Sequence, residues 1–484
     1  MKVLKKAQIR AAEENAVLNG IFSYTALMKN AGCAAADIIC QHYNVQNKRV
    51  TVVCGCGNNG GDGLVVASQL SAEGAIVTVC LPLGDVKTDT ARQMYPLPPD
   101  VKFSNVVEYN CDIMIDALFG IGLDRALEGA AADTIDKMNL CDAKKIALDL
   151  PSGVFCDGGV AGRVFRADLT VTFIALKPCH LLPPSSEYCG ETVVADIGAP
   201  ISEYEYLTTK PPVKQARPKN SHKGTFGTAL LICGSYGMCG AEILAARAAL
   251  RSGVGILKAV VCDKNYTAFT SSVPEAVTIP VGTAMSGAPA IDDKTLETAL
   301  SSSSALLIGC GLGRSAESVK LVKRVLSLVN IPTVIDADGI NALGGDINII
   351  GKIKAPVIIT PHPAEMARLC SVDTADIERN RVKYASALAT EKGCVVVLKG
   401  ANTVIAAPDG RVFFNTTGNA GMATGGSGDV LSGMLVAQLA AGSTALRAAT
   451  DCVWLHGHAA DLATEHISEE ALLPSDIIEE LKTL

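Results

Sequence analysis

The stretch Val50-Thr-Val-Val-Cys54-Gly-Cys-Gly-Asn-Asn-Gly-Gly-Asp-Gly63, followed by Leu64-Val-Val-Ala-Ser-Gln-Leu70, decides the fold of this chain. It combines a β-branched apolar run, a glycine-rich turn and a segment suited to a helix. In such a unit the main-chain amides at the start of the helix can face a phosphate. The stretch lacks the Gly-Lys-Ser/Thr sequence of a P-loop, so by itself it predicts a plain turn nearly as readily as a ligand site.

Similar apolar runs recur along the chain and are separated by spacers of helical length. This alternation predicts two layered α/β domains, the first of them a doubly wound parallel sheet. In such folds ligands bind beyond the carboxyl ends of the strands. Strands are expected at residues 50–54, 76–80, 113–116 and 145–149 in the first half and at 228–233, 305–308, 333–336, 357–360 and 395–398 in the second, with helices at 5–19, 24–42 and 240–252.

The two halves are separated by Thr208-Thr-Lys-Pro-Pro-Val-Lys-Gln-Ala-Arg-Pro-Lys-Asn-Ser221, which has three prolines and several charges but no apolar periodicity. This composition predicts a linker. We therefore expect one domain over residues 1–207, a linker over 208–221 and a second domain over 222–484.

The composition indicates a globular protein that acts on small molecules. Apolar residues make up 49% of the 484 residues and charged residues 19%, which favours packed layers over disorder. A net charge of −7 argues against a nucleic-acid partner. No run approaches the roughly 18 apolar residues of a membrane span, so we expect no membrane association and a cytoplasmic location. The 17 cysteines include no Cys-x-x-Cys pair and are expected to be free thiols. We also expect a homo-oligomer.

Two strands of the first half end in an aspartate, Asp116 and Asp149, and each is followed by a glycine-containing loop. Parallel strands bring their carboxyl ends to one edge of a sheet, so these carboxylates are expected to converge beside Asn58, Asn59 and Asp62. A single aspartate in such a place is usually a helix cap or a turn former. Together the polar residues predict a ligand site.

In the second half, four apolar strands are each followed by glycines, acids or a lysine. Singly, these residues are explained as caps, a loop histidine and a solvated lysine. Their shared position after strands predicts a phosphate or nucleotide site. The segments are Gly309-Cys-Gly-Leu-Gly313, Asp336-Ala-Asp-Gly-Ile-Asn341, Thr360-Pro-His-Pro-Ala-Glu365 and Lys399-Gly-Ala-Asn-Thr403.

A further glycine-rich segment, Asn419-Ala-Gly-Met-Ala-Thr-Gly-Gly-Ser-Gly-Asp429, leads into the apolar residues Val430-Leu-Ser-Gly-Met-Leu. Its four glycines allow close approach to a ligand, and the helix would direct free amides and a partial positive charge at an anion. Asp429 would repel a phosphate there unless it acted on a proton. The segment therefore predicts a phosphate cradle with a catalytic base.

The first-half motifs resemble the epimerase domain of the NAD(P)H-hydrate repair enzymes over about residues 1–205. These motifs are Asn58-Asn-Gly-Gly-Asp62, Asp116-Ala-Leu-Phe-Gly-Ile-Gly-Leu123 and Ala147-Leu-Asp-Leu-Pro-Ser-Gly153. The resemblance implies a Rossmann-like fold that interconverts the R and S forms of NADHX and NADPHX, which are hydrated at ring carbon 6. Ile174 and Cys179 stand where glycine is typical of that family.

The same resemblance implies roles for single residues. Asp149 would be the acid/base residue, and a potassium ion (K⁺) would be held by Asn59, Asp116 and Ser152. The residues implied to hold the dinucleotide are Asn58, Asn59, Gly60, Gly61, Asp62, Gly120, Ile121, Gly122, Leu123, Asp124, Arg125 and Ala126.

In the second half, Thr424-Gly-Gly-Ser-Gly-Asp-Val430 resembles the signature of ribokinase-like enzymes, in which the aspartate takes a proton from an alcohol. A wider set of motifs resembles the dehydratase domain of the same repair system, from about residue 220 onward. That resemblance implies removal of water from the S hydrate at the expense of ADP, giving AMP and phosphate. The motifs are Ser221-His-Lys-Gly-Thr-Phe-Gly227, Gly237-Met-Cys-Gly-Ala-Glu-Ile-Leu-Ala-Ala-Arg247, Val334-Ile-Asp-Ala-Asp-Gly-Ile-Asn-Ala-Leu343 and Thr360-Pro-His-Pro-Ala-Glu-Met-Ala-Arg368.

The resemblance implies that Asp429 deprotonates the ring hydroxyl for phosphoryl transfer, so that phosphate leaves in place of hydroxide. Magnesium (Mg²⁺) would bridge the phosphates of ADP, with Glu365 as an outer-shell contact. The residues implied to bind ADP are Lys399, Gly400, Ala401, Asn402, Thr403, Asn419, Ala420, Gly421, Met422, Ala423, Thr424, Gly425, Gly426, Ser427 and Gly428. Those implied to bind the hydrate are Ala241, Gly313, His362, Pro363, Ala364, Glu365, Met366, Ala367, Arg368 and Asp429.

Three functions are therefore open at this point. The first is a bifunctional repair enzyme whose epimerase supplies the S hydrate to its dehydratase. The second is a ribokinase-like kinase of a small molecule, such as a vitamin alcohol, with a regulatory first domain. The third is a nucleotide sensor without catalysis. The acids of the first half oppose the kinase, and Asp429 opposes the sensor.

Overall fold

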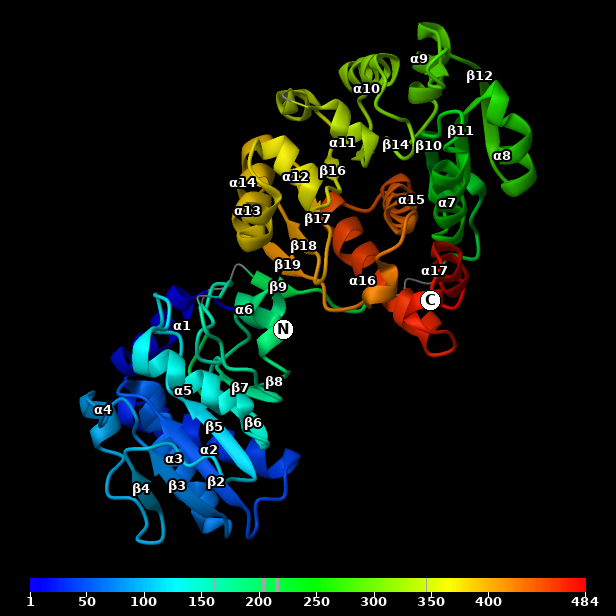
Figure 1. Ribbon diagram of the computed structural model, residues 1–484. Coiled ribbons are helices and arrows are strands. Elements are labelled where there is room, and N and C mark those ends of the chain that lie inside the picture. Colours follow the sequence, from blue (N-terminus) through cyan, green and yellow to red (C-terminus); the bar gives the residue numbers. More distant parts are fainter. Residues whose placement is uncertain (161, 202–205, 214–216, 345) are drawn as a thin grey trace. The chain divides into compact units, whose positions relative to one another are not determined.

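The computed structural model describes residues 1–160, 162–201, 206–213, 217–344 and 346–484. The chain forms two compact units, Met1–Tyr206 and Leu207–Leu484 (Figure 1). The segment predicted as a linker begins at the end of strand β9 (Tyr206–Thr208). Thr209 is buried and its main-chain N–H donates to the carbonyl of Phe414 at 2.8 Å. Residues 214–216 of that segment lie outside the described residues.

The first unit contains a seven-stranded sheet of order β4-β3-β2-β5-β6-β7-β8, in which every neighbouring pair is parallel. Counted from β2, this is the order 3-2-1-4-5-6-7, which begins as the doubly wound Rossmann order does and confirms the predicted fold class. The order reverses between β2 and β5. The strands are β2 (Arg49–Cys54), β3 (Ile76–Cys80), β4 (Lys102–Ser104), β5 (Ile113–Ala117), β6 (Lys144–Leu148), β7 (Leu169–Phe173) and β8 (Glu191–Ala195).

Helices cover both faces of this sheet because its strands are apolar on both sides. Val52 packs into a core with α2 and α3, whereas its neighbour Val53 packs into a second core with α5. The short strand β1 (Lys2–Val3) bridges to Leu176. The helices are α1 (Lys6–Leu18), α2 (Tyr24–His42), α3 (Asn58–Ala72), α4 (Asp89–Arg92), α5 (Gly129–Leu140), α6 (Pro178–Leu181) and η1 (Ser185–Tyr188).

The second unit is built on a sheet whose central strands follow the order β17-β16-β15-β14-β10-β11-β12 and are parallel. If only these parallel strands are counted, starting from β10 and reading from the β12 end, the order is again 3-2-1-4-5-6-7. It reverses between β10 and β14. Antiparallel strands extend both edges. The strands are β10 (Thr228–Ile232), β11 (Ile256–Cys262), β12 (Val277–Thr283), β13 (Pro289–Ala290), β14 (Ala305–Ile308), β15 (Thr333–Ile335), β16 (Val357–Ile359), β17 (Val395–Leu398), β18 (Val404–Ala406) and β19 (Val412–Phe414).

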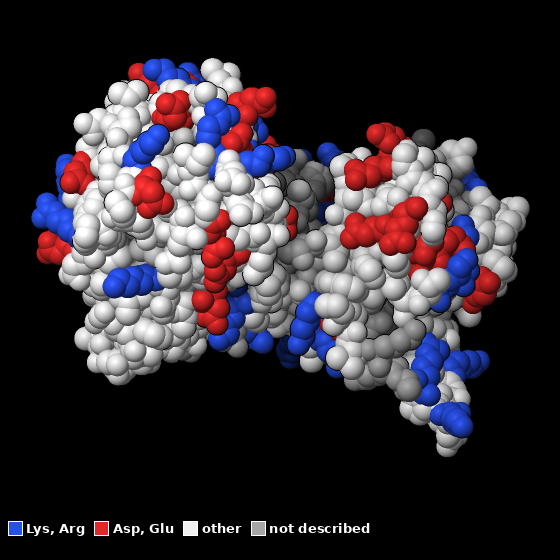
Figure 2. All heavy atoms as spheres, turned by 90° about the horizontal axis from the view of Figure 1, so that it is seen from below, with Lys and Arg blue, Asp and Glu red and all other residues white. Residues whose placement is uncertain are grey.

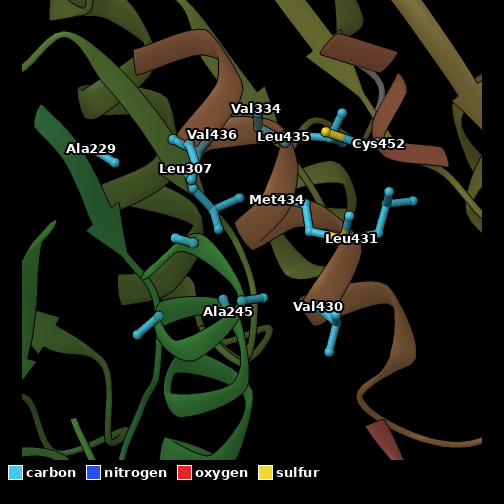
Figure 3. Close-up of a cluster of buried hydrophobic side chains, with 14 of the residues drawn as sticks. Ala229, Ala245, Leu307, Val334, Val430, Leu431, Met434, Leu435, Val436 and Cys452 are labelled. Atoms are coloured by element: carbon cyan, nitrogen blue, oxygen red, sulfur yellow. The ribbon is translucent and has the colours of Figure 1, made fainter. Parts of the chain in front are cut away.

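Helix α15 (Ser427–Ala440) is the centre of the second core. It is apolar all round, as expected of a helix enclosed by protein, and its Leu435 and Val436 belong to the same apolar cluster as Leu307 of the sheet (Figure 3). The other helices are η2 (Lys223–Phe226), α7 (Cys239–Arg251), η3 (Asp263–Asn265), α8 (Tyr266–Ser272), α9 (Asp293–Ser301), α10 (Ala316–Leu328), α11 (Asp338–Ala342), η4 (Ile347–Lys352), α12 (Pro363–Cys370), α13 (Thr374–Arg379), α14 (Arg381–Lys392), η5 (Ala420–Met422), α16 (Ala445–Thr464), η6 (Glu469–Ala471) and α17 (Pro474–Glu480).

The described helices include none that is both long and apolar enough to cross a membrane. On the face shown in Figure 2, most Lys and Arg side chains lie among Asp and Glu side chains and leave wide uncharged areas.

Close contact between α15 and α7 gives a test of the core. A Cβ atom at Gly433 would lie 2.1 Å from the carbonyl oxygen of Ala245, so no side chain fits between the helices. Gly433→Ala should lower the free energy of unfolding by about 1–3 kcal/mol because the core is overpacked. Chemical denaturation of the full chain measures the change.

Gly240→Ala is the matched control, because Gly240 lies in α7 with nothing within 4 Å of an added Cβ. There alanine should stabilise by about 0.5–1 kcal/mol through its higher helix propensity. Equal effects at the two positions would contradict the packing argument.

Candidate active sites

Asp149 directly follows β6 and lies at the centre of the first site. It is buried and has a φ of +65°, a conformation that is uncommon for residues other than glycine. Its Oδ1 accepts a hydrogen bond from Lys177 Nζ at 2.6 Å, and its Oδ2 accepts one from the main-chain N–H of Ile121 at 3.1 Å. The strained backbone and the two donors fix the direction of the carboxylate.

Lys177 and His180 complete this arrangement, although the sequence analysis gave neither a role. Lys177 is fully buried, and its Nζ also donates to the carbonyl of Phe173 at 3.0 Å and to Thr172 Oγ1. Nδ1 of His180 accepts from the N–H of Lys177 at 3.1 Å, so Nε2 carries the proton that it shares with the carbonyl of Asp149 at 3.2 Å. Burial and the charge of Lys177 lower the pKa of His180 to about 3, so its ring is neutral.

Asp116 and Ser152, two of the residues implied to hold potassium, are in direct contact. The N–H and Oγ of Ser152 each donate to the carboxylate of Asp116 at 2.8 Å. Burial raises the pKa of Asp116 to about 6, against these hydrogen bonds. The third residue, Asn59, donates through Nδ2 to the carbonyl of Leu148 at 3.3 Å, and its Oδ1 is buried without a hydrogen-bond partner. An unpaired amide oxygen is a suitable ligand for a hard cation such as K⁺.

Close backbone approach defines the rest of the first site. The spacing Gly55-x-Gly57-x-x-Gly60 is that of a dinucleotide fingerprint, which the sequence analysis failed to recognise. Cβ atoms at Gly55 and Gly60 would each lie 1.9 Å from a carbonyl oxygen. Because α3 begins at Asn58, residues 58–62 are the first turns of a helix and not a loop. A Cβ at Gly120 would lie 2.8 Å from Asp149 Oδ2, whereas residues 124–126 are exposed.

Ile174, which replaces a glycine typical of the family, has a φ of +71°. A β-branched residue in this region carries strain on the order of 1–3 kcal/mol. Its side chain packs against the cluster of Leu4, Ile9 and Ala175, which offsets the strain. The loop after β7 therefore keeps the left-handed backbone that glycine would favour.

The second site centres on Asp336, which follows β15. Lys399 Nζ lies 2.8 Å from its Oδ1, and Ser432 Oγ donates to its Oδ2 at 2.8 Å. Burial favours the neutral acid, but the ammonium of Lys399 and these hydrogen bonds hold the pKa of Asp336 below its usual range. The sequence analysis placed Asp336 in one of the segments predicted to form a phosphate or nucleotide site and assigned it no individual role.

Asp429 lies beside this ion pair in the first turn of α15, as predicted. Ligand atoms of Asp429, Asp336 and Cys310 all lie within 4.8 Å of one another. Burial, and then the negative charge of Asp336, raises the pKa of Asp429 to about 6. A carboxylate with that pKa is ionised at neutral pH and accepts a proton more readily than an ordinary aspartate.

A pocket of about 880 Å³ opens at the N-terminus of α15. A Cβ at Gly428 would lie 3.2 Å from Lys399 Nζ, so the ammonium and the amides of the helix face the same space. The lining residues are 362–363, 399–403, 415, 417–420, 422–424, 427–428, 431, 453 and 456–457. They include most of the residues implied to bind ADP, apart from Gly421, Gly425 and Gly426.

Several residues that shape this pocket had no role in the sequence analysis. Asp461 accepts hydrogen bonds from the N–H of Gly418 at 2.9 Å and from Asn419 Nδ2 at 3.1 Å, so the side chain of Asn419 holds the loop. His456 lies 3.4 Å from Ser427 Oγ, and burial lowers its pKa to about 4. The sequence analysis relied on strand ends and glycine-rich turns, and both residues lie inside α16, so neither pattern marked them.

The segment His362 to Arg368 presents only its start to the pocket. His362 is the N-cap of α12: its N–H donates to Glu365 Oε2 at 2.9 Å, and its Nδ1 accepts from the N–H of Ala364 at 3.2 Å. Met366 and Ala367 are buried in the core. The structure therefore gives Glu365 a capping role.

Other residues implied to bind the hydrate lie nearer to β10 and β14, the strands between which the sheet order reverses, and short contacts hold them in place. Gly313 has a φ of +74° and its N–H donates to Asp338 Oδ2 at 2.8 Å. Ala241, near the start of α7, packs against Gly311. A Cβ atom added to Gly311 would lie 2.9 Å from the Cβ of Ala241. Arg368 Nε donates to Asn341 Oδ1 at 3.1 Å.

Comparison with known proteins identifies both units. Residues 229–483 match the family described as NAD(P)H-hydrate dehydratase. Residues 24–179 match the family described as YjeF-related protein N-terminus.

Relatives match almost the whole chain. It is 36% identical to the bifunctional NAD(P)H-hydrate repair enzyme Nnr of Moorella thermoacetica, over 94% of this chain and 91% of that protein. It is 32% identical to the Escherichia coli enzyme of the same name, over 98% and 92%. Among solved structures, the ADP/ATP-dependent NAD(P)H-hydrate dehydratase of Bacillus subtilis, co-crystallised with ATP/Mg²⁺, is 34% identical with a TM-score of 0.48, covering 57% of this chain and 93% of that chain. The two matched segments and the full-length relatives show that this chain belongs to the family of bifunctional NAD(P)H-hydrate repair enzymes.

Proposed function

We propose that the two units divide NAD(P)H-hydrate repair between two separate sites. The first unit epimerises R- and S-NAD(P)HX at Asp149, and the second dehydrates the S form at Asp429 with ADP. The observation that carries this proposal is the placement of Asp429 in the first turn of α15, beside Lys399 and a pocket of about 880 Å³. A phosphate cradle with its own base suits phosphoryl transfer to a hydroxyl group. A cytoplasmic location and a homo-oligomeric state remain predictions.

In the first unit, Asp149 acts on the hydroxyl group at ring carbon 6. The hydroxyl oxygen takes up a proton and leaves as water as the lone pair of the ring nitrogen forms a C=N⁺ bond, and another water then adds to the other face and gives up a proton. Lys177 Nζ and the N–H of Ile121 hold the carboxylate of Asp149 in one direction for proton transfer. The buried, neutral His180 fixes the backbone of Asp149, because its Nε2 donates a hydrogen bond to the main-chain carbonyl of Asp149.

Potassium fits the first site at Asn59. The unpaired, buried Oδ1 of Asn59 supports a cation ligand there, with the carboxylate of Asp116 and the hydroxyl of Ser152 as the other donors. A bound K⁺ would supply positive charge for the dinucleotide phosphates. Gly120, in the loop implied to hold the substrate, lies near both Asp149 and Asn59, the proposed cation ligand. A cation bound at Asn59 would therefore also help to fix this loop.

In the second unit, Asp429 takes the proton of the ring hydroxyl as the terminal phosphoryl group of ADP transfers to its oxygen. Lys399 and the N-terminal amides of α15 stabilise the negative charge of the moving group. The ring nitrogen then expels phosphate, and loss of a proton from the neighbouring ring carbon restores the reduced nicotinamide. AMP and phosphate are the other products.

The described residues offer Mg²⁺ no cage of free carboxylates near this pocket. Asp336 is paired with Lys399, and the nearby Cys310 thiol suits a softer metal. Glu365 is occupied by its contacts with His362. Mg²⁺ would therefore be held by the phosphates of ADP and by water.

One assay tests the proposed function. The purified chain is mixed with chemically prepared R- or S-NADHX, Mg²⁺ and ADP, and the absorbance of reduced nicotinamide is followed. Both epimers should be converted, and without ADP the epimers should interconvert with no gain in absorbance. If the chain acts on neither epimer but phosphorylates another alcohol, the repair function is wrong and the kinase is correct.

Substitution of the two aspartates should separate the two activities. Asp429→Asn should reduce dehydration of S-NADHX by about 100-fold or more, the usual contribution of a general base, and leave epimerisation intact. Asp149→Asn should do the reverse, as measured by chromatography of the epimers without ADP. Loss of both activities on either change would contradict two independent sites.

The pH profile of dehydration should reflect Asp429, because the base works only when ionised. The value of kcat/KM should fall as the pH decreases through about 6, the pKa to which burial and Asp336 raise this group. Asp336→Asn should move this acid limb to lower pH, since it removes a negative charge beside Asp429 and leaves the ammonium of Lys399 unpaired. Asp293→Asn, at an exposed position of the same unit, is the control and should leave the limb in place.

A further inference from the structure

We propose that Glu13 of helix α1 is a second catalytic residue of the epimerase site. It exchanges a proton with the oxygen on one face of the ring, and Asp149 does so with the oxygen on the opposite face. This inference rests on the proposed epimerase function. Epimerisation moves a hydroxyl group from one face of the ring to the other, so oxygen leaves one face as water and arrives on the opposite face. One fixed carboxyl group on one side of the ring cannot serve both faces, whereas two carboxyl groups can.

Helix α1 covers the loop that positions Asp149. Ile9 of α1 belongs to the apolar cluster that packs against Ile121 and Ile174, and Lys6 Nζ donates to the carbonyl of Gly122 at 3.4 Å. The N–H of Ile121 in turn donates to Asp149 Oδ2. Glu13 follows Ile9 by four residues, so the two side chains lie on the same face of the helix. Glu13 thus lies, half-buried, on the face of α1 that packs against this loop.

The charges around Glu13 suit it to proton transfer. Burial, and then the negative charge of Asp149, raises the pKa of Glu13 to about 7, while Lys177 and Arg10 oppose the shift and Glu14 adds to it. A carboxyl group whose pKa lies near the ambient pH both gives and takes a proton readily.

Asp62 of α3 also interacts electrostatically with Asp149 and Glu13, but it is less suited to be the second proton-transfer residue. Burial, and then the charges of Asp149 and Glu13, holds its pKa well above the usual range. It is therefore harder to ionise than an ordinary aspartate. The Asp149 carboxylate instead receives hydrogen bonds from Lys177 and Ile121 and acts as an acceptor.

The protons balance across the two residues. The protonated Glu13 gives its proton to the leaving hydroxyl oxygen, the bond between carbon 6 and that oxygen breaks, and the ring nitrogen forms the C=N⁺ bond. Water adds to the opposite face of carbon 6, and Asp149 takes the proton that this water releases. Glu13 ends as the carboxylate and Asp149 as the acid. Turnover in the other direction, or exchange with solvent, restores the first state.

The test measures interconversion of R- and S-NADHX without ADP, by chromatography, as a function of pH. In the natural chain, kcat/KM from one epimer should decrease above about pH 7 as Glu13 loses its proton. Glu13→Gln should reduce the rate by about 100-fold or more and abolish this basic limb. A residue with only a structural role would not remove the limb.

Three controls define the outcome. Glu14→Gln, at the neighbouring exposed position, should keep the natural rate below the limb and keep the limb itself, shifted slightly to lower pH because a negative charge near Glu13 is lost. Dehydration of S-NADHX with ADP by the Glu13→Gln chain should be unchanged and shows that the chain is folded. If Glu13→Gln keeps the limb and a rate within threefold of the natural chain, or if only Asp62→Asn removes the limb, the proposal is wrong. Absence of interconversion in the natural chain would instead refute the epimerase function.

Discussion

An ion pair between a lysine and a buried, strand-end aspartate organises the reactive end of each unit. In the first unit Lys177 lies 2.6 Å from Asp149, and in the second Lys399 lies 2.8 Å from Asp336. Removing two charges from water is costly, and the attraction between them offsets this cost only when the geometry is good and further hydrogen bonds are made. Thr172 and Phe173 provide those bonds in the first pair, and Ser432 does so in the second.

The shared sheet order explains why these pairs lie where they do. In both units the order of the strands reverses beside the first strand of the sheet, and helices that leave adjacent strands then pass to opposite faces. Loops after β2 and β5 in one unit, and after β10 and β14 in the other, therefore separate and leave room for a ligand. Asp149 and Asp336 follow the second strand from this opening, β6 and β15, and their lysines follow β7 and β17 farther along the sheet.

The two pairs have different chemical consequences. Lys177 binds the residue that we propose as the acid/base, so the carboxylate of Asp149 is oriented and is held as an acceptor. Lys399 binds a neighbour of the base, and the charge of Asp336 helps to raise the pKa of Asp429. The first unit thus holds the proposed reacting carboxylate, Asp149, rigidly. In the second unit the neighbouring Asp336 raises the basicity of the proposed base, Asp429. These differences agree with water exchange at one site and phosphoryl transfer at the other.

The sequence by itself determined the α/β layers, the strand-end placement of Asp116, Asp149 and Asp336, and the helix start at Asp429, because strands, glycine turns and caps are local patterns. It also carried the motifs of the family. Only the tertiary structure brought Lys177 to Asp149, Asp461 to Asn419 and α1 with Glu13 toward the first site. These contacts join residues 28, 42 and more than 100 positions apart. No local pattern encodes them, since they depend on how the sheet and its helices close around each opening.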